Sequence, residues 1–256
     1  MFKIATWNVN SLRVRLPHVL KWLESARPDV LTLQETKLQD RDFPAADFES
    51  RGYQCLFSGQ KTYNGVAMLS REAADDVVTA LPGMDDPQKR LLCATVDGVR
   101  VVNVYVPNGA SVGSDKYAYK LQWLRNLAAF IQAQLQQHPR LVLLGDFNIA
   151  PGDEDVHDPE QWREKILCST PEREAFQALL DTGLEDTYRL FPREEREFSW
   201  WDYRMAAFRR NLGLRIDLIL ASRPLAALCS SSTIDKEPRR WERPSDHAPV
   251  MAEFDV

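Results

Sequence analysis

Leu141-Val142-Leu143-Leu144-Gly145-Asp146-Phe147-Asn148 is the stretch of this 256-residue chain that decides its fold class. Four consecutive apolar residues end at a glycine, a carboxylate and an amide, a pattern typical of a buried strand that stops at a turn. Before this stretch, residues 116–137 place six apolar side chains on one stripe of a helix: Leu121, Leu124, Leu127, Ala128, Ile131 and Leu135. A long amphipathic helix followed by a buried strand predicts helices packed against a sheet.

The same succession of apolar runs with polar ends recurs along the whole chain. Further strands are predicted at residues 3–9, 30–34, 53–57, 65–70, 91–96, 99–106, 198–201, 216–221, 233–235 and 249–254. The dipeptides Asn64-Gly65 and Asp97-Gly98 are typical hairpin turns. Helices are predicted between the first two strands and at residues 172–180. Hairpins with interspersed helices predict an α/β layered sandwich with mixed sheets.

Length and composition predict one soluble domain. A chain of 256 residues lies near the upper end of what one hydrophobic core supports, and no linker-like stretch divides it. A single domain spanning residues 1–256 is therefore expected. No apolar run is long enough to cross a bilayer, and residues 1–7 lack the pattern of a signal peptide. We therefore expect a cytoplasmic protein without a membrane partner.

Charge and cysteine content leave the function open. A net charge of −5 at first argues against a nucleic-acid partner. However, a carboxylate-rich metal site is itself negative, and DNA needs only a local basic surface. Cys55, Cys93, Cys168 and Cys229 lack zinc-site spacing, which favours reduced structural thiols over a cysteine–histidine catalytic pair.

Polar side chains gather just where the predicted strands end. They comprise four carboxylates, two amides, one phenol and one imidazole: Glu35, Asp146, Asp217, Asp246, Asn8, Asn148, Tyr105 and His247. Strand ends from distant positions can converge on one rim of a sheet. Oxygen donors without thiolates suit Mg²⁺ or Mn²⁺, and such an ion suits phosphate chemistry. Taken singly, each acidic residue is more often a turn former or helix cap.

Several longer motifs share one resemblance. They are Trp7-Asn8-Val9-Asn10, Leu33-Gln34-Glu35-Thr36-Lys37, Gly59-Gln60-Lys61, Gly65-Val66-Ala67, Gly145-Asp146-Phe147-Asn148-Ile149, Phe198-Ser199-Trp200-Trp201-Asp202-Tyr203-Arg204, Gly213-Leu214-Arg215-Ile216-Asp217 and Ser245-Asp246-His247-Ala248-Pro249. Together, and in this order, they resemble the exonuclease III and abasic-site endonuclease branch of the endonuclease/exonuclease/phosphatase superfamily. The resemblance runs from Lys3 to Phe254.

The resemblance implies a DNase I-like fold, a four-layer α/β sandwich in which helices flank two facing mixed sheets. It implies a Mg²⁺-dependent DNA-repair phosphodiesterase, with Mn²⁺ as a substitute, that works as a 3′–5′ exonuclease, 3′-end processor and abasic-site endonuclease. The expected partner is double-stranded DNA with abasic sites or 3′ ends, bound by a monomer. Alternatives on the same fold are a DNase I-like enzyme, a lipid or inositol phosphatase, and an RNA-binding regulator without catalysis.

The resemblance also implies roles for the residues at the strand ends. The metal would be held mainly by Glu35, helped by Asn8, Asp146, Asn148, Asp246 and His247. Asp146 would orient or deprotonate the attacking water, and His247, oriented by Asp217, would contact a phosphate oxygen. Asn148 would stabilise the five-coordinate phosphorus, and Tyr105 would assist the phosphate as a phenol or a phenolate. The identity of the general base stays open.

Substrate contacts follow from the same resemblance. Asn108, Arg90 and Lys116 are expected to contact the phosphate backbone, with solvated surface charge as the alternative. Trp200, Leu214 and Ile216 match the wall that receives a flipped abasic sugar, with core packing as the alternative. Residues 205–210 combine apolar and basic side chains that suit a DNA groove or an amphipathic loop.

One loop departs from the family pattern. Relatives that cut abasic sites often carry a small residue next to the phosphate on the 5′ side of the lesion, where this chain has Ile166 and Leu167. A branched side chain there would crowd continuous DNA more than a mobile 3′ end. The sequence therefore predicts weak abasic-site incision and intact 3′-end processing.

Overall fold

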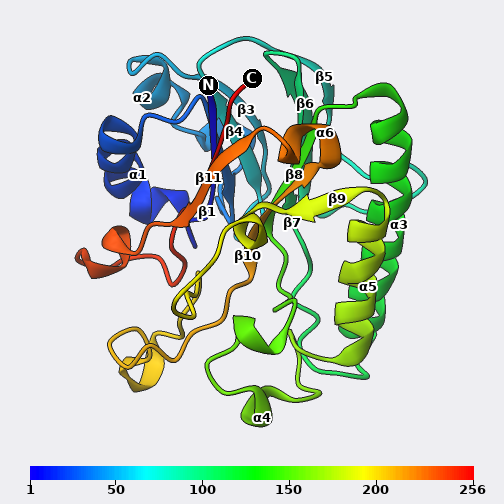
Figure 1. Ribbon diagram of the computed structural model, residues 1–256. Coiled ribbons are helices and arrows are strands. Elements are labelled where there is room, and N and C mark those ends of the chain that lie inside the picture. The colour runs from blue at the N-terminus through cyan, green and yellow to red at the C-terminus, as the bar shows by residue number, and fades with distance from the viewer.

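The computed structural model describes residues 1–256, which form two six-stranded sheets lying face to face (Figure 1). The first sheet has the order β11-β12-β1-β2-β4-β3, with bounds β1 Phe2–Asn8, β2 Val30–Gln34, β3 Gln54–Ser58, β4 Val66–Ser70, β11 Cys229–Ile234 and β12 Val250–Phe254. The second has the order β5-β6-β7-β8-β10-β9, with bounds β5 Ala74–Val78, β6 Leu91–Val96, β7 Val99–Tyr105, β8 Leu141–Asp146, β9 Leu184–Asp186 and β10 Asp217–Ser222.

Both sheets are mixed, as the sequence predicts. The pairs β1–β2 and β7–β8 are parallel, whereas the other neighbouring strands are antiparallel. A parallel pair needs a long crossover connection. Helix α1 (Leu12–Ala26) supplies it between β1 and β2, and helix α3 (Asp115–Gln137) supplies it between β7 and β8.

Helices form the two outer layers of the sandwich (Figure 1). Helices α1 and α2 (Ala45–Glu49) pack on the first sheet, and α3 and α5 (Thr170–Asp181) pack on the second. The remaining short elements are α4 Pro159–Trp162, α6 Arg223–Ala226 and 3-10 turns at Asp40–Asp42, Asp153–Asp155, Thr187–Leu190, Arg204–Ala206 and Glu237–Arg240. No helix combines the length and apolar character that crossing a bilayer would need. The predicted four-layer α/β sandwich is confirmed.

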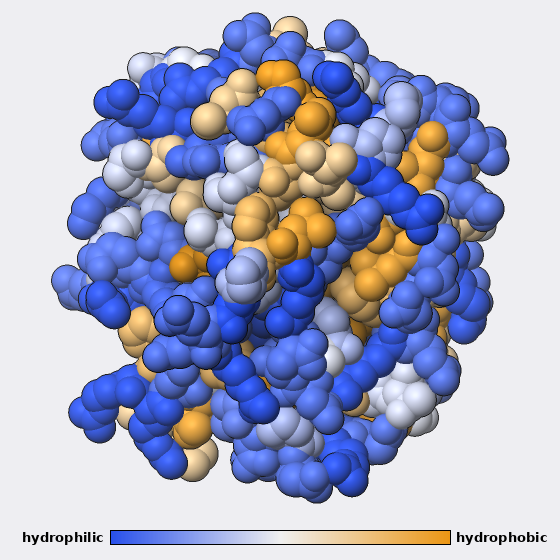
Figure 2. Space-filling model, in the orientation of Figure 1, coloured by the Kyte–Doolittle hydropathy of each residue, from blue (hydrophilic) through white to orange (hydrophobic).

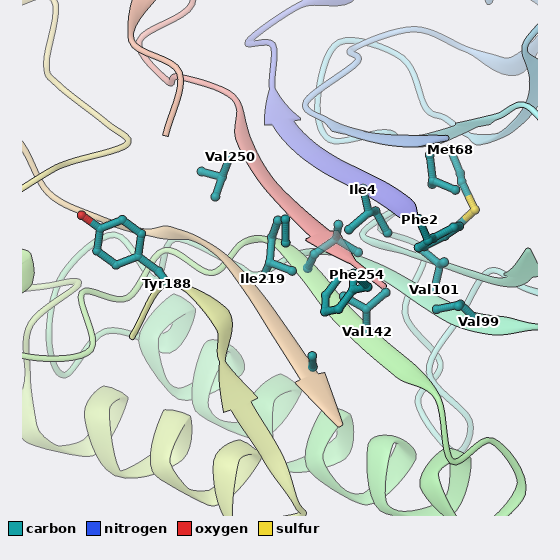
Figure 3. Packing of buried hydrophobic residues seen from close by; sticks show 14 of the residues in the cluster. Phe2, Ile4, Met68, Val99, Val101, Val142, Tyr188, Ile219, Val250 and Phe254 are labelled. Carbon is teal, nitrogen blue, oxygen red and sulfur yellow. The ribbon is translucent and has the colours of Figure 1, made fainter. Parts of the chain in front are cut away.

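Alternation along the strands fills three cores. Successive side chains of a strand point to opposite faces, so both faces of a central strand can be buried. Ile4 of β1 and Val142 of β8 meet in the core between the sheets (Figure 3). Their neighbours Ala5 and Leu143 pack under the helices instead. Figure 2 shows that hydrophilic residues dominate the surface in this view, with apolar residues in small groups between them.

A buried amide joins the two sheets near the rim where β2 ends. The Asn103 Nδ2 group of β7 donates to the carbonyl oxygens of Leu33 and Ala67 in the first sheet, at 3.1 and 2.9 Å. Gln34 Nε2 donates back to Asn103 Oδ1 at 2.7 Å. None of these groups reaches water. Because hydrogen bonds are directional, the bridge sets how the sheets are aligned, which apolar packing alone specifies less sharply.

One predicted strand is wrong, and two strands were not predicted. Residues 198–201 are not a strand, because the amides of Ser199 and Trp200 both donate to the Leu214 carbonyl oxygen, which interrupts a regular ladder. The unpredicted strands are β5 and β9. Strand β5 is a largely exposed edge with an irregular register, and β9 has only three residues, so neither shows apolar alternation.

We expect Asn103→Ala to lower the free energy of unfolding by about 2–4 kcal/mol, because it strands buried carbonyl and amide partners in both sheets. Urea unfolding followed by circular dichroism would measure the loss. Asn126→Ala on α3, where the amide bonds only to exposed Gln122, is the matched control and should cost little. Equal stability of the two variants would contradict the bridging role of Asn103.

Candidate active site

The predicted catalytic residues converge at the rim where β1, β2, β7 and β8 end. Asn8 is the last residue of β1, and Glu35 directly follows β2. In the second sheet, Asp146 at the end of β8 lies between Tyr105 of β7 and Asp217 of β10, opposite each of them in register. The structure therefore brings these strand ends together at one place, which draws on both sheets rather than on one.

One amide bridges the carboxylates of the two sheets. Asn8 Nδ2 donates to Asp146 Oδ2 at 2.8 Å and to Glu35 Oε1 at 3.0 Å. Its Oδ1 atom accepts from the backbone N–H of Asn10. In this arrangement Asn8 presents hydrogen-bond donors to the carboxylates rather than an oxygen to a cation. Asn8 therefore orients the carboxylates, and its role as a metal ligand stays a prediction.

Three predicted ligands form a group that could hold a divalent ion. One ligand atom each from Glu35, Asp146 and His247 lie within 4.8 Å of one another. Two carboxylates suit a hard cation such as Mg²⁺. Asp246 is not in this group, because its two oxygens accept from Asn10 Nδ2 and Trp200 Nε1, each at 3.0 Å. The residues present thus fit a metal centred on Glu35 and Asp146.

His247 is held by a buried carboxylate. Its Nδ1 atom lies 2.8 Å from Asp217 Oδ2, and its Nε2 atom lies 3.9 Å from Asp146 Oδ2. Ser199 Oγ donates to the same Asp217 oxygen at 2.7 Å. Burial alone would lower the pKa of His247, but the carboxylates of Asp217, Asp146 and Asp246 outweigh it and raise the pKa to about 10. The protonated His247 ring faces the site with an N–H donor and offers no lone pair to a metal, so its predicted role as a ligand stays a prediction.

The neighbouring acids are shifted in different directions. Burial raises the pKa of Asp146, although the charge of His247 opposes the shift. Burial also raises the pKa of Glu35, but the Lys37 ammonium outweighs it, so the net shift is downward. The pKa of Tyr105 is well above its usual value because of burial and the nearby Glu35 and Asp146 carboxylates. Tyr105 is thus a neutral phenol here, which favours donation over a phenolate role.

The Asn148 loop rests on a buried ion pair that was not predicted from the sequence. The Lys120 ammonium donates to the carbonyl oxygens of Asn148 at 2.6 Å and Asn108 at 3.2 Å, and it pairs with Glu172. Glu172 in turn accepts from the backbone N–H of Leu167. Lys120 lies one helical turn before Leu124 on the apolar stripe of α3. A lysine on an apolar stripe is the sequence feature that could have predicted a buried ion pair.

Asn148 itself faces both its loop and the carboxylates. Its Nδ2 atom donates to the Val106 carbonyl oxygen at 3.1 Å and lies 3.3 Å from Asp146 Oδ2. Its Oδ1 atom accepts from Asn108 Nδ2 at 3.1 Å. With both ends of the amide engaged, Asn148 is a positioned hydrogen-bonding group, and its part in metal binding stays a prediction.

The predicted phosphate contacts lie together beside the catalytic group. Arg90, Asn108 and Lys116 line one pocket of about 480 Å³. The Arg90 guanidinium lies 4.6 Å from the centre of the Tyr105 ring and donates to the Tyr105 carbonyl oxygen at 3.1 Å. The pocket therefore borders the site and carries positive charge, as a phosphate backbone requires.

The predicted sugar wall is only partly open. Leu214 and Ile216 are 0% and 1% exposed and belong to a small core that also contains Leu167. Trp200 is partly exposed, packs against this core and donates its indole N–H to Asp246. In this conformation core packing describes Leu214 and Ile216, so the wall available to a ligand is the Trp200 ring.

Comparison with known proteins agrees with this geometry. The sequence model described as the endonuclease/exonuclease/phosphatase family matches residues 5–247, so the chain belongs to that family. It is 37% identical to exodeoxyribonuclease III of Haemophilus influenzae, over 98% of this chain and 99% of that one. The solved 3′–5′ exonuclease NExo from Neisseria meningitidis is 54% identical, with a TM-score of 0.98 and full coverage of both chains. An AP endonuclease from Archaeoglobus fulgidus is 43% identical, with a TM-score of 0.96, again over both full chains.

The Asp217–His247 pair generates a direct test. Because Asp217 orients His247 and stabilises its charge, Asp217→Asn should lower kcat for phosphodiester cleavage by up to about 10⁴-fold, the effect known for the aspartate of serine proteases. KM should change little, and kinetics under saturating substrate would separate the two. Asp181→Asn, on the exposed side of α5, is the control. A kcat of Asp217→Asn within a few-fold of that control would exclude the pairing role.

Proposed function

We propose that this protein is a DNA-repair nuclease of the exonuclease III type that uses Mg²⁺, with Mn²⁺ as a substitute. The observation that carries the proposal is the pair of carboxylates Glu35 and Asp146, bridged by Asn8, beside a charged His247. Two oxygen ligands next to an imidazolium suit a substrate that carries a phosphate. The fold and the nuclease relatives support the same conclusion.

The metal would be held by Glu35 and Asp146, where it would polarise a phosphoryl oxygen and stabilise the leaving oxygen. The chain's own groups supply the remaining steps. His247 Nε2–H would donate to a nonbridging phosphate oxygen, with its ring fixed by Asp217 at Nδ1. Asp146 would accept the proton of the attacking water.

Neutral donors would complete the transition-state site. Asn148 Nδ2, 3.3 Å from Asp146, would turn toward the charge that builds on the five-coordinate phosphorus. The Tyr105 phenol would donate to the phosphate, since its raised pKa keeps the proton on the oxygen. Arg90 and Lys116 would hold the neighbouring phosphates from the adjoining pocket.

The proposed substrate is double-stranded DNA with a 3′ end or an abasic site. One solved structure of the 54% identical NExo is described as a 3′ phosphatase bound to a product DNA hairpin. Within the predicted segment 205–210, Ala207 is buried and Phe208 packs against the core between the sheets, which leaves Met205, 76% exposed, beside Tyr203, 51% exposed, and Arg204. These residues suit contact with a DNA groove. The RNA-binding alternative lacks comparable support, because the relatives reported above are nucleases.

Three further expectations belong to this proposal: one domain, a cytoplasmic location and a monomer. A single domain is supported by cores that share the same two sheets and by a family match that spans residues 5–247. A reducing compartment agrees with Cys55, Cys93, Cys168 and Cys229, none of which forms a disulfide. The monomeric state stays a prediction for size-exclusion chromatography.

Removing the principal metal ligand tests the proposed function. Two labelled duplexes would be tested in Mg²⁺ and in EDTA. The wild-type protein should cut the one with a recessed 3′ end readily and the one with a central abasic analogue weakly in Mg²⁺, and it should spare both in EDTA. Glu35→Ala should cut more than about 10³-fold more slowly, because the ion contributes several kcal/mol to the transition state. Glu49→Ala, at the exposed end of α2, is the control. Near-normal turnover of Glu35→Ala would remove Glu35 from the metal role.

Leu167 offers a test of substrate preference. Its backbone has a φ of 74°, which favours glycine, and its buried side chain packs with Leu214 and Ile216. Leu167→Gly therefore suits the backbone and empties part of the small core against which Trp200 packs. We expect abasic-site incision to rise by about tenfold or more, because small shifts of a phosphate change rates strongly, while 3′-exonuclease activity changes little.

Leu167→Ala serves as the matched variant, because it shortens the side chain without the backbone freedom of glycine. An intermediate gain in incision would assign the effect to side-chain size. Robust incision by the unmodified protein, at its 3′-exonuclease rate, would show that Leu167 does not restrict the DNA.

A further inference from the structure

We propose that the Lys37 ammonium group is a built-in counter-cation of the metal site that competes with a divalent ion for Glu35. The inference rests on the proposed function, because it takes Glu35 as the principal metal ligand. Lys37 is not a further ligand in this proposal. It weakens the binding of the metal to the free protein and so helps to set the metal affinity.

The contacts of Lys37 place its charge directly on the metal ligand. Its Nζ atom lies 2.8 Å from Glu35 Oε2 and 2.5 Å from Asn10 Oδ1. The other oxygen of Glu35, Oε1, accepts from Asn8. Both oxygens of the Glu35 carboxylate are therefore occupied by donors from the chain itself. Because each carboxylate oxygen keeps a second lone pair, a divalent ion at Glu35 would share the carboxylate with the ammonium unless the ammonium moves.

The backbone around Lys37 is shaped to aim this side chain. Glu35 and Lys37 both adopt left-handed conformations, with φ of 52° and 53°, which non-glycine residues seldom adopt. The Lys37 N–H donates to the Asn64 carbonyl oxygen at 2.9 Å. Next to it, Gly65 has no room for a side chain, since a Cβ there would lie 2.2 Å from Thr36 Oγ1. The lysine is thus held over the site by a tightly packed turn.

Charge balance explains why a cation stands at this place. Glu35 and Asp146 share the Asn8 amide, and their oxygens would repel each other in a poorly solvated site. His247 neutralises the Asp146 and Asp217 side of the group. The basic side chain within ion-pair distance of Glu35 is that of Lys37. The ammonium therefore does for Glu35 in the metal-free protein what the divalent ion does after binding.

The surroundings allow the ammonium to leave. The Lys37 side chain is 27% exposed and borders an open surface pocket, shared with Arg13, Arg41 and Lys61. A divalent ion and an ammonium on one carboxylate repel each other, so metal binding weakens the Lys37–Glu35 pair or breaks it. The weakening of that pair subtracts from the metal affinity. Removal of the ammonium should consequently tighten metal binding, the opposite of what removal of a ligand does.

The test measures Mn²⁺ binding to the free protein by electron paramagnetic resonance, with Mg²⁺ as a competitor and without DNA. Lys37→Gln keeps a polar group near Asn10, and Lys37→Met keeps the length of the chain. Both should lower the Kd of Mn²⁺ by about tenfold, the effect of losing a partly screened ion pair. Lys37→Arg keeps the charge and should stay within about twofold of wild type. Lys61→Met, which removes a charge from the same surface pocket without touching Glu35, is the control.

The outcomes separate this inference from the proposed function. Unchanged or weaker Mn²⁺ binding in both neutral variants, together with weaker binding in Glu35→Ala, overturns the counter-cation role and leaves Glu35 as a ligand. Wild-type binding in Glu35→Ala overturns the metal role of Glu35 and this inference with it. Equal tightening in Lys61→Met and Lys37→Gln would reduce the effect to general surface charge and would also overturn the inference.

Discussion

The site depends on one amide, Asn8, that holds a carboxylate of each sheet. Its Nδ2 atom lies 2.8 Å from Asp146 in the second sheet and 3.0 Å from Glu35 beside the first. Hydrogen bonds of this kind tolerate changes of only a few tenths of an ångström, so the separation of the sheets must be equally well defined. The close-packed core between the sheets and the buried Asn103 bridge supply that definition.

Buried charge is balanced at each level of the site. Asp217 is paired with His247 and accepts a hydrogen bond from Ser199, and Glu35 is paired with Lys37. Farther out, Arg215 lies between the carboxylates of Asp155 and Asp186, and Lys120 pairs with Glu172. Removing one member of such a pair leaves an uncompensated charge in the poorly solvated protein interior. That loss destabilises the protein by more than the intact pair stabilises it. The loops that carry Asn148 and Leu167 are therefore anchored by charge as well as by apolar packing.

Much of the fold was predictable because local patterns report local structure. The turn at Asp97-Gly98 predicted the β6–β7 hairpin, and both residues adopt the positive φ that such a turn requires. The apolar stripe of residues 116–137 predicted α3. The strand predicted at residues 198–201 was wrong for a physical reason. The side chains of Phe198 and Trp201 are buried as in a strand, but the amides of Ser199 and Trp200 donate to the same carbonyl oxygen. Strand β5 was not predicted because an exposed edge strand has no buried face, so its apolar and polar residues do not alternate.

The sequence by itself determined which chemical groups stand at the strand ends and that these ends could meet, because strand termination and residue type are both local properties. Only the tertiary structure decided which groups touch. Asn8 and Asp146 are separated by 138 positions, and their contact exists only because two different sheets pack face to face. The same holds for Lys120 beneath Asn148 and for Asp246, which bonds to Asn10 and Trp200 rather than joining the metal group. Such contacts depend on the register between sheets, which is set by the packing of the whole core and leaves no periodic trace along the chain.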